Sequence, residues 1–174
     1  MIYMVDHVFT DPAQEPAWHA WYDGYLKKLL SVPGIHSTQR FKAVGESPSR
    51  FLAMYSIDSA DVYTSEGYKK IGGGGSQSAS FHPCYRLWTR NLFDGAVSAP
   101  VVCTGQRVIA FDRDARDAQC KLGTLESRLL WLNAVGLHMT TKYRGVIVLD
   151  ASEAAPAIPG SHLYEPFTAA QTKL

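Results

Sequence analysis

The sequence is poor in cysteine, and its histidines are scattered. The three cysteines, Cys84, Cys103 and Cys120, lie far apart with no C-x-x-C pair. A zinc site or a disulfide framework needs a tighter arrangement, so we expect neither and interpret these side chains as reduced, mostly packed thiols. No H-x-H or H-E-x-x-H spacing occurs, and we predict no metal site and no cofactor.

Charge and long apolar runs are also scarce. Charged residues make up 19% of the chain and the formal net charge is +1, so no overall field attracts nucleic acid or an anionic membrane. No apolar run is long enough to span a bilayer. Residues 1–7 lack the basic start and apolar stretch of a signal peptide. We therefore expect a cytoplasmic protein without nucleic-acid or membrane partners.

The first 95 residues alternate between strand and helix patterns. Residues 2–9 favour a strand. Asp11 is the expected N-cap of a helix, with Pro12 at its first position. The apolar stripe of this helix is Trp18, Trp21, Tyr22, Tyr25, Leu26, Leu29 and Leu30. Strands at 35–41 and 51–57, a weaker helix at 59–71, a glycine-rich loop at 72–80 and a strand at 86–93 follow. This β-α-β-β-α-β order is the ferredoxin-like pattern.

After a linker at 94–100 the pattern restarts. We expect a strand at 107–111, a helix presenting Leu122, Leu125, Leu129 and Leu132, a strand or hairpin at 137–149, a loop at 151–160 and a strand at 163–165. Residues 32–42 align with 134–144, with His36 opposite His138. The sequence therefore predicts an α+β fold of tandem ferredoxin-like units, a complete copy at 1–95 and a shortened copy at 96–174 packed on it. His36 and His138 should begin equivalent strands.

Several segments resemble the EthD-type members of the dimeric α+β barrel superfamily. These are Trp21-Tyr22-Asp23, residues 29–35, Arg40-Phe41 and residues 50–55. The resemblance implies two ferredoxin-like sheets closed into an α+β barrel, with space between sheet and helices for a small hydrophobic ligand. Relatives include cofactor-free monooxygenases, isomerases, cyclases and haem-binding branches, so the implied reaction is less specific than the fold. Leu26 stands where many of these sequences carry a histidine, so no role of that histidine transfers to this chain.

Histidines supply the candidate acid-base groups. Strand alternation places His36, Thr38 and Arg40 on one face, which we expect inside the barrel, and His138, Thr140 and Lys142 on a matching face. His7 shares a strand face with aromatic residues, whereas Asp6 points away and is expected to be solvated. Each histidine can be a proton-transfer group near neutral pH. Each also has a structural interpretation, in which the imidazole satisfies a turn or a neighbouring strand.

These residues lead to a functional hypothesis. We expect His7 and His36 to be catalytic and to share a cavity bordered by Tyr55 and Trp88, with residues 72–80 as a mobile flap that carries His82. The remaining binding candidates are Arg40, His138 and Lys142. We expect Arg40, Tyr55 or Lys142 to stabilise the oxyanion that forms in the reaction. The predicted function is a cofactor-independent lyase or isomerase acting on a small aromatic or carbonyl-bearing metabolite. A cofactor-free monooxygenase and a non-catalytic ligand-binding or assembly protein are the alternatives. Because the shortened copy leaves a sheet edge bare, we also expect a homodimer.

Overall fold

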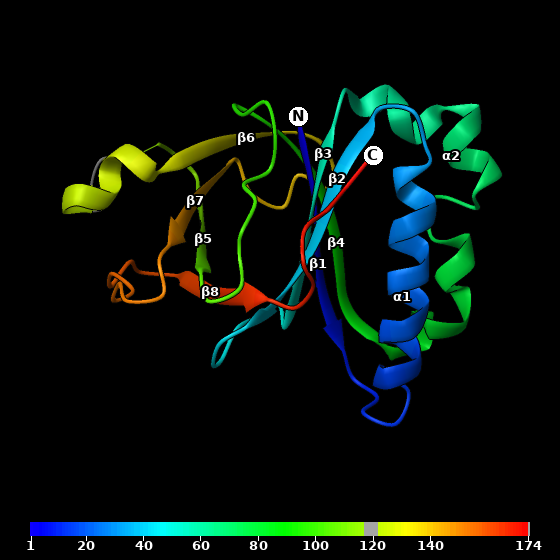
Figure 1. Cartoon of the computed structure of the whole chain (residues 1–174), viewed down its shortest axis with the longest axis horizontal. Coiled ribbons are helices and arrows are strands. Elements are labelled where there is room, and N and C mark those ends of the chain that lie inside the picture. The colour runs from blue at the N-terminus through cyan, green and yellow to red at the C-terminus, as the bar shows by residue number, and fades with distance from the viewer. Residues whose placement is uncertain (117–121, 174) are drawn as a thin grey trace.

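The computed structural model describes residues 1–116 and 122–173 (Figure 1). The first part of the chain forms β1 (Ile2–Phe9), α1 (Glu15–Leu30), β2 (Ile35–Ala43), β3 (Phe51–Ile57), the 3₁₀ helix η1 (Ala60–Thr64), α2 (Glu66–Lys70), the 3₁₀ helix η2 (Ser76–Cys84) and β4 (Tyr85–Asp94). The second part forms β5 (Arg107–Arg113), the 3₁₀ helix η3 (Gly123–Arg128), β6 (Leu130–Leu137), β7 (Tyr143–Leu149), β8 (Ser161–Pro166) and β9 (Gln171–Thr172).

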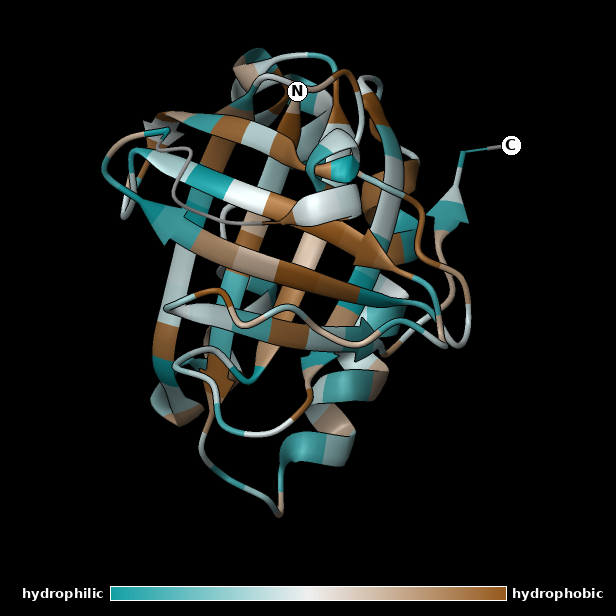
Figure 2. Cartoon of the chain, turned by 90° about the vertical axis from the view of Figure 1, so that its left-hand side faces the viewer, coloured by the Kyte–Doolittle hydropathy of each residue, from teal (hydrophilic) through white to brown (hydrophobic). Residues whose placement is uncertain are grey.

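Eight strands close into an antiparallel barrel within one chain. Neighbouring strands follow the order β3-β1-β4-β6-β7-β5-β8-β2, and β2 pairs with β3 to complete the ring. In Figure 2 the strands of the second part cross in front of those of the first. Each of β1–β8 therefore has a partner on both sides, and none presents the bare edge on which the homodimer was argued. The homodimer stays a prediction without that support.

Alternation along β1 separates two apolar cores. Ile2 and Met4 point into the barrel, where they join residues of the second part such as Val108 and Leu132. Tyr3 and Val5 point to the outer face, which α1, α2 and η2 cover (Figure 1). A third, smaller core lies on β5 and β7 and contains Ile109, Phe111, Ile147, Leu149, Leu122 and Ile158. The molecule is thus an α+β barrel whose two α-helices lie against one half.

The predicted helix stripe is confirmed, but its start is later than expected. Trp18, Tyr22, Leu26 and Leu29 are the buried residues of α1. The Asp11 carboxylate accepts hydrogen bonds from the backbone of Ala13 at 2.9 Å and from the Gln14 side chain at 2.8 Å. It therefore stabilises a turn before the helix, and Gln14 rather than Asp11 is the N-cap.

The helix predicted from the leucines after residue 121 is wrong. Only Gly123–Arg128 are helical, as the 3₁₀ helix η3, and Leu130 already begins β6. The leucines do not share one helix face. Leu122 packs in the third, smaller core on β5 and β7, whereas Leu132 points into the barrel. The weaker helix at 59–71 also divides, into η1 and α2, because Ser65 caps a new helix through its hydroxyl.

The paired histidine motifs do not occupy equivalent places. His36 is the second residue of β2, whereas His138 follows the last residue of β6 in the turn that leads to β7. The expectation that both begin equivalent strands is therefore wrong. The two parts nevertheless share a strand order, since β2-β3-β1-β4 and β6-β7-β5-β8 correspond one to one.

Asp6 is buried rather than solvated. Its carboxylate accepts a hydrogen bond from Arg144 Nη1 at 3.1 Å, and Arg144 also donates to both oxygens of Asp112 at 2.7 and 2.9 Å. Burial alone would lower the pKa of Arg144, but the two carboxylates raise it. This cluster joins β1, β5 and β7 at one end of the barrel interior.

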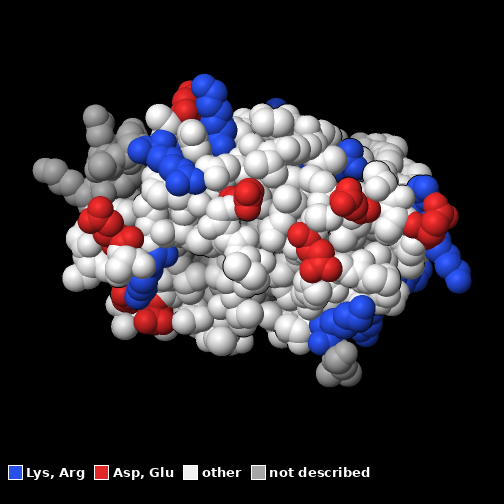
Figure 3. All heavy atoms as spheres, turned by 90° about the horizontal axis from the view of Figure 1, so that it is seen from above, with Lys and Arg blue, Asp and Glu red and all other residues white. Residues whose placement is uncertain are grey.

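The surface of the described residues carries mixed charges. On the face in Figure 3, acidic and basic side chains are interspersed among uncharged ones. No helix in this part of the chain has the length and apolar character needed to cross a membrane. Cys84 is buried as expected and Cys103 is exposed, whereas Cys120 lies outside the described residues.

Candidate functional site

A cavity lies between the outer face of β1, β3 and β4 and the helices that cover it. It holds about 500 Å³ of empty space, partly open to solvent, of which the centres of water molecules can reach about 50 Å³. Its lining is mostly aromatic: Tyr3, Val5, His7, Trp21, Tyr22, Tyr25, Leu29, Tyr55, Tyr63, Tyr68, Gly72, Gly75, Gln77, Ser78, Tyr85, Trp88 and Arg90. We call this space the aromatic cavity. A lining of aromatic side chains with a few polar groups is typical of sites that bind small molecules, although the space that water can reach is smaller than the roughly 300–1,000 Å³ of most such sites.

Strand pairing builds the floor of the aromatic cavity. In β1, His7 pairs with Phe51 of β3 and Trp88 of β4, and Val5 pairs with Arg90. Directly paired residues of antiparallel strands point to the same face. The polar groups of the floor therefore come from neighbouring strands and are held by the hydrogen bonds of the sheet.

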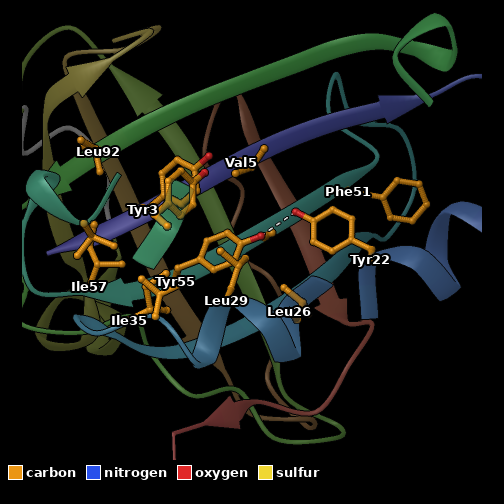
Figure 4. Packing of buried hydrophobic residues seen from close by; sticks show 14 of the residues in the cluster. Tyr3, Val5, Tyr22, Leu26, Leu29, Ile35, Phe51, Tyr55, Ile57 and Leu92 are labelled. Carbon is orange, nitrogen blue, oxygen red and sulfur yellow. Dashed lines mark hydrogen bonds between the residues drawn. The ribbon is translucent and has the colours of Figure 1, made fainter. Parts of the chain in front are cut away.

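Tyrosine hydroxyls bridge the floor and the roof. Tyr22 of α1 and Tyr55 of β3 hydrogen-bond through their hydroxyls at 2.7 Å (Figure 4). Burial raises the pKa of Tyr22 to about 12 and raises that of Tyr55 as well. Both phenols are therefore neutral near pH 7, and since one hydroxyl donates to the other, one hydroxyl proton of the pair is left for a further partner.

His7 is an uncharged imidazole in an aromatic surrounding. It is 3% exposed, and its ring lies 5.5 to 5.7 Å, between centroids, from the rings of Trp18, Tyr22 and Tyr85. Burial, assisted by the nearby charge of Arg40, lowers its pKa to about 3. Its ring nitrogens form no hydrogen bond with the described residues. The lone pair of this imidazole is therefore free for a ligand.

Two other groups of the lining lack hydrogen-bond partners. The hydroxyl of Tyr63 and Nε of Arg90 are buried and make no hydrogen bond with the described residues. Leaving such groups unpaired costs about 1–3 kcal/mol each, and native proteins rarely do so without a bound water or ligand. Both residues line the aromatic cavity, so its wall contains polar groups that the protein leaves unpaired.

Arg40 lies behind the cavity rather than inside the barrel. Its guanidinium carbon is 4.1 Å from the centroid of the Tyr22 ring, and its side chain donates to His19 Nδ1 at 2.7 Å and to Asp23 at 3.3 Å. It does not line the cavity. Its charge adds to the effect of burial, which is the main reason that the pKa of His7 is low. The prediction that Arg40 sits on a barrel-facing surface is wrong.

His36 is far from the site that was predicted for it. Pairing of β2 with β3 passes directly from Ile35 to Ser37, so His36 is left out of the register as a bulge. Its side chain is 54% exposed and lies 2.6 Å from the Asp58 carboxylate. The structure does not bring His36 and His7 into one cavity.

The remaining predicted residues divide into two groups. Tyr55 and Trp88 line the aromatic cavity as expected. His82 is exposed, but its ring lies near that of Trp88 in a tilted arrangement, with centroids 5.3 Å apart, and it hydrogen-bonds with Ser78. His138 and Lys142 are exposed in the turn after β6 and do not line it. His138 does contact Arg90, accepting a hydrogen bond at Nδ1 from its backbone at 3.2 Å.

The glycine run at 72–75 is a folded wall of the cavity. The Tyr68 hydroxyl accepts a hydrogen bond from the Gly74 backbone at 2.9 Å. A Cβ on Gly75 would lie 2.6 Å from Trp88, and one on Gly73 would lie 2.3 Å from Tyr68. The glycines therefore let the chain approach two aromatic rings closely, and the 3₁₀ helix η2 follows at once where a loop was predicted.

The sequence analysis gives Tyr63, Tyr68 and Arg90 no place in the site, although all three line the cavity. The alternation of Trp88 and Arg90 on one strand face was a usable signal. No spacing in the sequence brings η1 and α2 onto that face. No three His, Cys, Asp or Glu side chains gather within residues 1–116 and 122–173 to hold a metal.

Comparisons with known proteins bear on the fold. Neither the protein-family models nor the curated protein sequences match this chain. A solved structure of an anthrone oxidase-like protein aligns with 99% of this chain and 93% of its own, with a TM-score of 0.56 and 12% sequence identity. At this identity the likeness concerns the fold alone, and it supports a small α+β barrel.

Proposed function

We propose that this chain is a cofactor-free enzyme that abstracts a proton from a small aromatic carbonyl compound bound in the aromatic cavity. The observation that carries the proposal is the buried His7 imidazole, neutral and without a protein hydrogen-bond partner, in an aromatic wall. A neutral imidazole can take a proton from a ligand held within hydrogen-bond reach. The aromatic rings bury the ligand and exclude water from it.

The low pKa of His7 makes its basicity depend on the ligand. In the empty site, burial and Arg40 disfavour the imidazolium. When His7 takes a proton from a bound carbon acid, an enolate forms beside it, and this opposite charge favours the imidazolium. In the Tyr22–Tyr55 pair one hydroxyl donates to the other, which leaves the second hydroxyl proton to donate to the enolate oxygen. Proton transfer is thus favoured only in the complex.

The fate of the enolate separates two reactions. Return of the proton to another atom, or loss of a leaving group, makes the enzyme an isomerase or a lyase. The fold neighbour, an anthrone oxidase-like protein, favours the second reaction, oxygenation. There a methylene group reacts with O₂ to give a carbonyl and one water, so two C–H bonds break, one C=O bond forms and O₂ is reduced.

Part of the fold assignment belongs to the same proposal. We infer that both parts of the chain are ferredoxin-like units, since their strand orders correspond, and that the chain is an EthD-like relative of the α+β barrel enzymes. In the second unit η3 and the segment 150–160 stand in place of the two helices.

Turnover of anthrone in air tests the proposed function. We expect wild-type protein to accelerate its conversion, with anthraquinone and O₂ uptake identifying oxygenation, and an isomeric product without O₂ uptake identifying isomerisation. His7→Gln should lower kcat/KM by about two to four orders of magnitude, while the exposed control His36→Gln should not. Equal rates in wild type and His7→Gln at equal folding would remove His7 from the mechanism. Tight binding without turnover would favour a non-catalytic ligand-binding protein.

A further inference from the structure

The charged lining of the aromatic cavity is of one sign only. Arg90 is the one lysine or arginine among its lining residues, and none of those residues is an aspartate or a glutamate. His7 is neutral, so it adds no second charge. A ligand that enters the cavity therefore meets a single positive charge in a weakly polar surrounding, where electrostatic attraction is stronger than in water.

Arg90 has no anionic partner in the described part of the chain. Its Nε is buried without a hydrogen bond, and its Nη2 lies 3.4 Å from Nε2 of His138. The Nδ1 of His138 already accepts from the Arg90 backbone, and a neutral imidazole has one acceptor nitrogen. The guanidinium also lies over Trp88, 4.9 Å from the ring centroid. The Nε–H of this guanidinium is thus left without an acceptor.

Neutral phenols lie close to the same charge. Tyr3 and Tyr63 have ring centroids 4.6 Å apart, and the hydroxyl of Tyr63 has no partner. Burial raises the pKa of both phenols, while the charge of Arg90 partly opposes this at Tyr3. Protonated phenols and a guanidinium are all hydrogen-bond donors. All three residues line the aromatic cavity and can donate to an oxygen of a ligand.

We propose that the aromatic cavity selects ligands that carry an anionic oxygen, a carboxylate or a phenolate on an aromatic ring, and that Arg90 is the residue that recognises it. Val5, the strand partner of Arg90, is two residues from His7, a rise of about 7 Å. A single ring can therefore place its oxygen at Arg90 and a carbon toward His7. The location of the site rests on the proposed function, but the charge preference is a separate claim.

Binding of two probes of the same shape tests this claim without any chemistry. 2-Naphthoate is anionic and 2-naphthamide is neutral. Calorimetric titration at pH 7.5 should show wild-type protein binding naphthoate at least about tenfold more tightly than naphthamide. Arg90→Gln should weaken naphthoate binding about tenfold to a hundredfold and leave naphthamide unchanged. Arg90→Lys should keep part of the preference because it keeps the charge.

The matched control is Arg86→Gln, an exposed arginine of the same strand, which should alter neither affinity. Thermal melts establish that each variant is folded. Equal affinities of wild type for both probes, equal losses for both probes in Arg90→Gln, or no naphthoate binding at millimolar concentration would each overturn the inference. If naphthoate binds through Arg90 but His7→Gln keeps full turnover, the proposed function fails and the charge preference stands.

Discussion

At the scale of single residues, the site depends on titratable groups that burial keeps uncharged over a wide pH range. His7 stays neutral well below its ordinary pKa because it is buried among aromatic rings near the Arg40 guanidinium. The phenols of Tyr22 and Tyr55 are neutral at pH 7 like any phenol, and burial raises their pKa further. Such groups lower stability unless folding elsewhere compensates. A protein keeps them where they contact a ligand, which agrees with the proposed role of the cavity.

His7 should make folding stability depend on pH. An exposed histidine in the unfolded chain has a pKa near 6.5, whereas His7 in the folded protein has a pKa of about 3. Above pH 6.5 both states are neutral, and between 6.5 and 3 the unfolded state alone binds the proton. The free energy of unfolding should therefore fall with decreasing pH across this window, by at most about 1.4 kcal/mol per pH unit from this one group.

Urea unfolding of His7→Gln at pH 7, 6, 5 and 4 measures this contribution. We expect a shallower loss of stability than in wild type over the same range, because the variant cannot bind that proton in its unfolded state. His36→Gln changes an exposed histidine and serves as the control. Identical slopes in wild type and His7→Gln would show that the His7 pKa is not depressed.

At the scale of elements, sequence patterns predict those parts that local spacing determines. The α1 stripe, the strands of the first part and the cavity-facing side of His7 follow from periodicity. Three features do not. The bulge at His36 results from the pairing of β2 with β3. Leu122, before β6, and Leu132, within it, pack in two different cores. Asp6 is buried because Arg144 reaches it across the barrel. Each depends on contacts between segments far apart in the chain.

The glycine run offers an element-scale test of the cavity wall. Gly74 and Gly75 both have positive φ, of 80° and 98°, so alanine at either position is strained and should cost about 1 kcal/mol or more. Only Gly75 lies against Trp88, since a Cβ on Gly74 meets nothing within 4 Å.

We therefore expect Gly75→Ala to displace Trp88 and weaken naphthoate binding about tenfold, with Gly74→Ala binding as wild type. Urea unfolding and calorimetric titration of both variants give the comparison. Equal binding by the two variants would mean that Trp88 does not shape the occupied site.

At the scale of the whole molecule, the barrel is held together by contacts between its two parts. Strands of the first and second parts pair at β4–β6 and at β2–β8. Inside, Arg144 of the second part is 7% exposed at its side chain and pairs with Asp6 of the first part. A buried ion pair adds little net stability, but loss of one partner leaves an uncompensated charge.

Arg144→Met should therefore lower the free energy of unfolding by about 3–5 kcal/mol. The double variant Asp6→Asn/Arg144→Met should recover part of this loss, because the buried charge is then removed. Asp112 is 43% exposed at its side chain and needs less compensation. Urea unfolding of wild type, Arg144→Met and the double variant measures the loss of stability and its partial recovery. A double variant no more stable than Arg144→Met would show that the cost arises from packing rather than from the Asp6 charge.

The central claim is that His7 takes a proton from a carbon acid bound in the aromatic cavity. The direct measurement is exchange of the methylene protons of anthrone with solvent in D₂O under nitrogen, followed by proton NMR, because exchange reports the proton step without any later reaction. We predict that wild-type protein and His36→Gln exchange these protons well above the buffer rate, and that folded His7→Gln is slower by about two to four orders of magnitude. Exchange by His7→Gln at the wild-type rate, or by wild type at the buffer rate, would contradict the account.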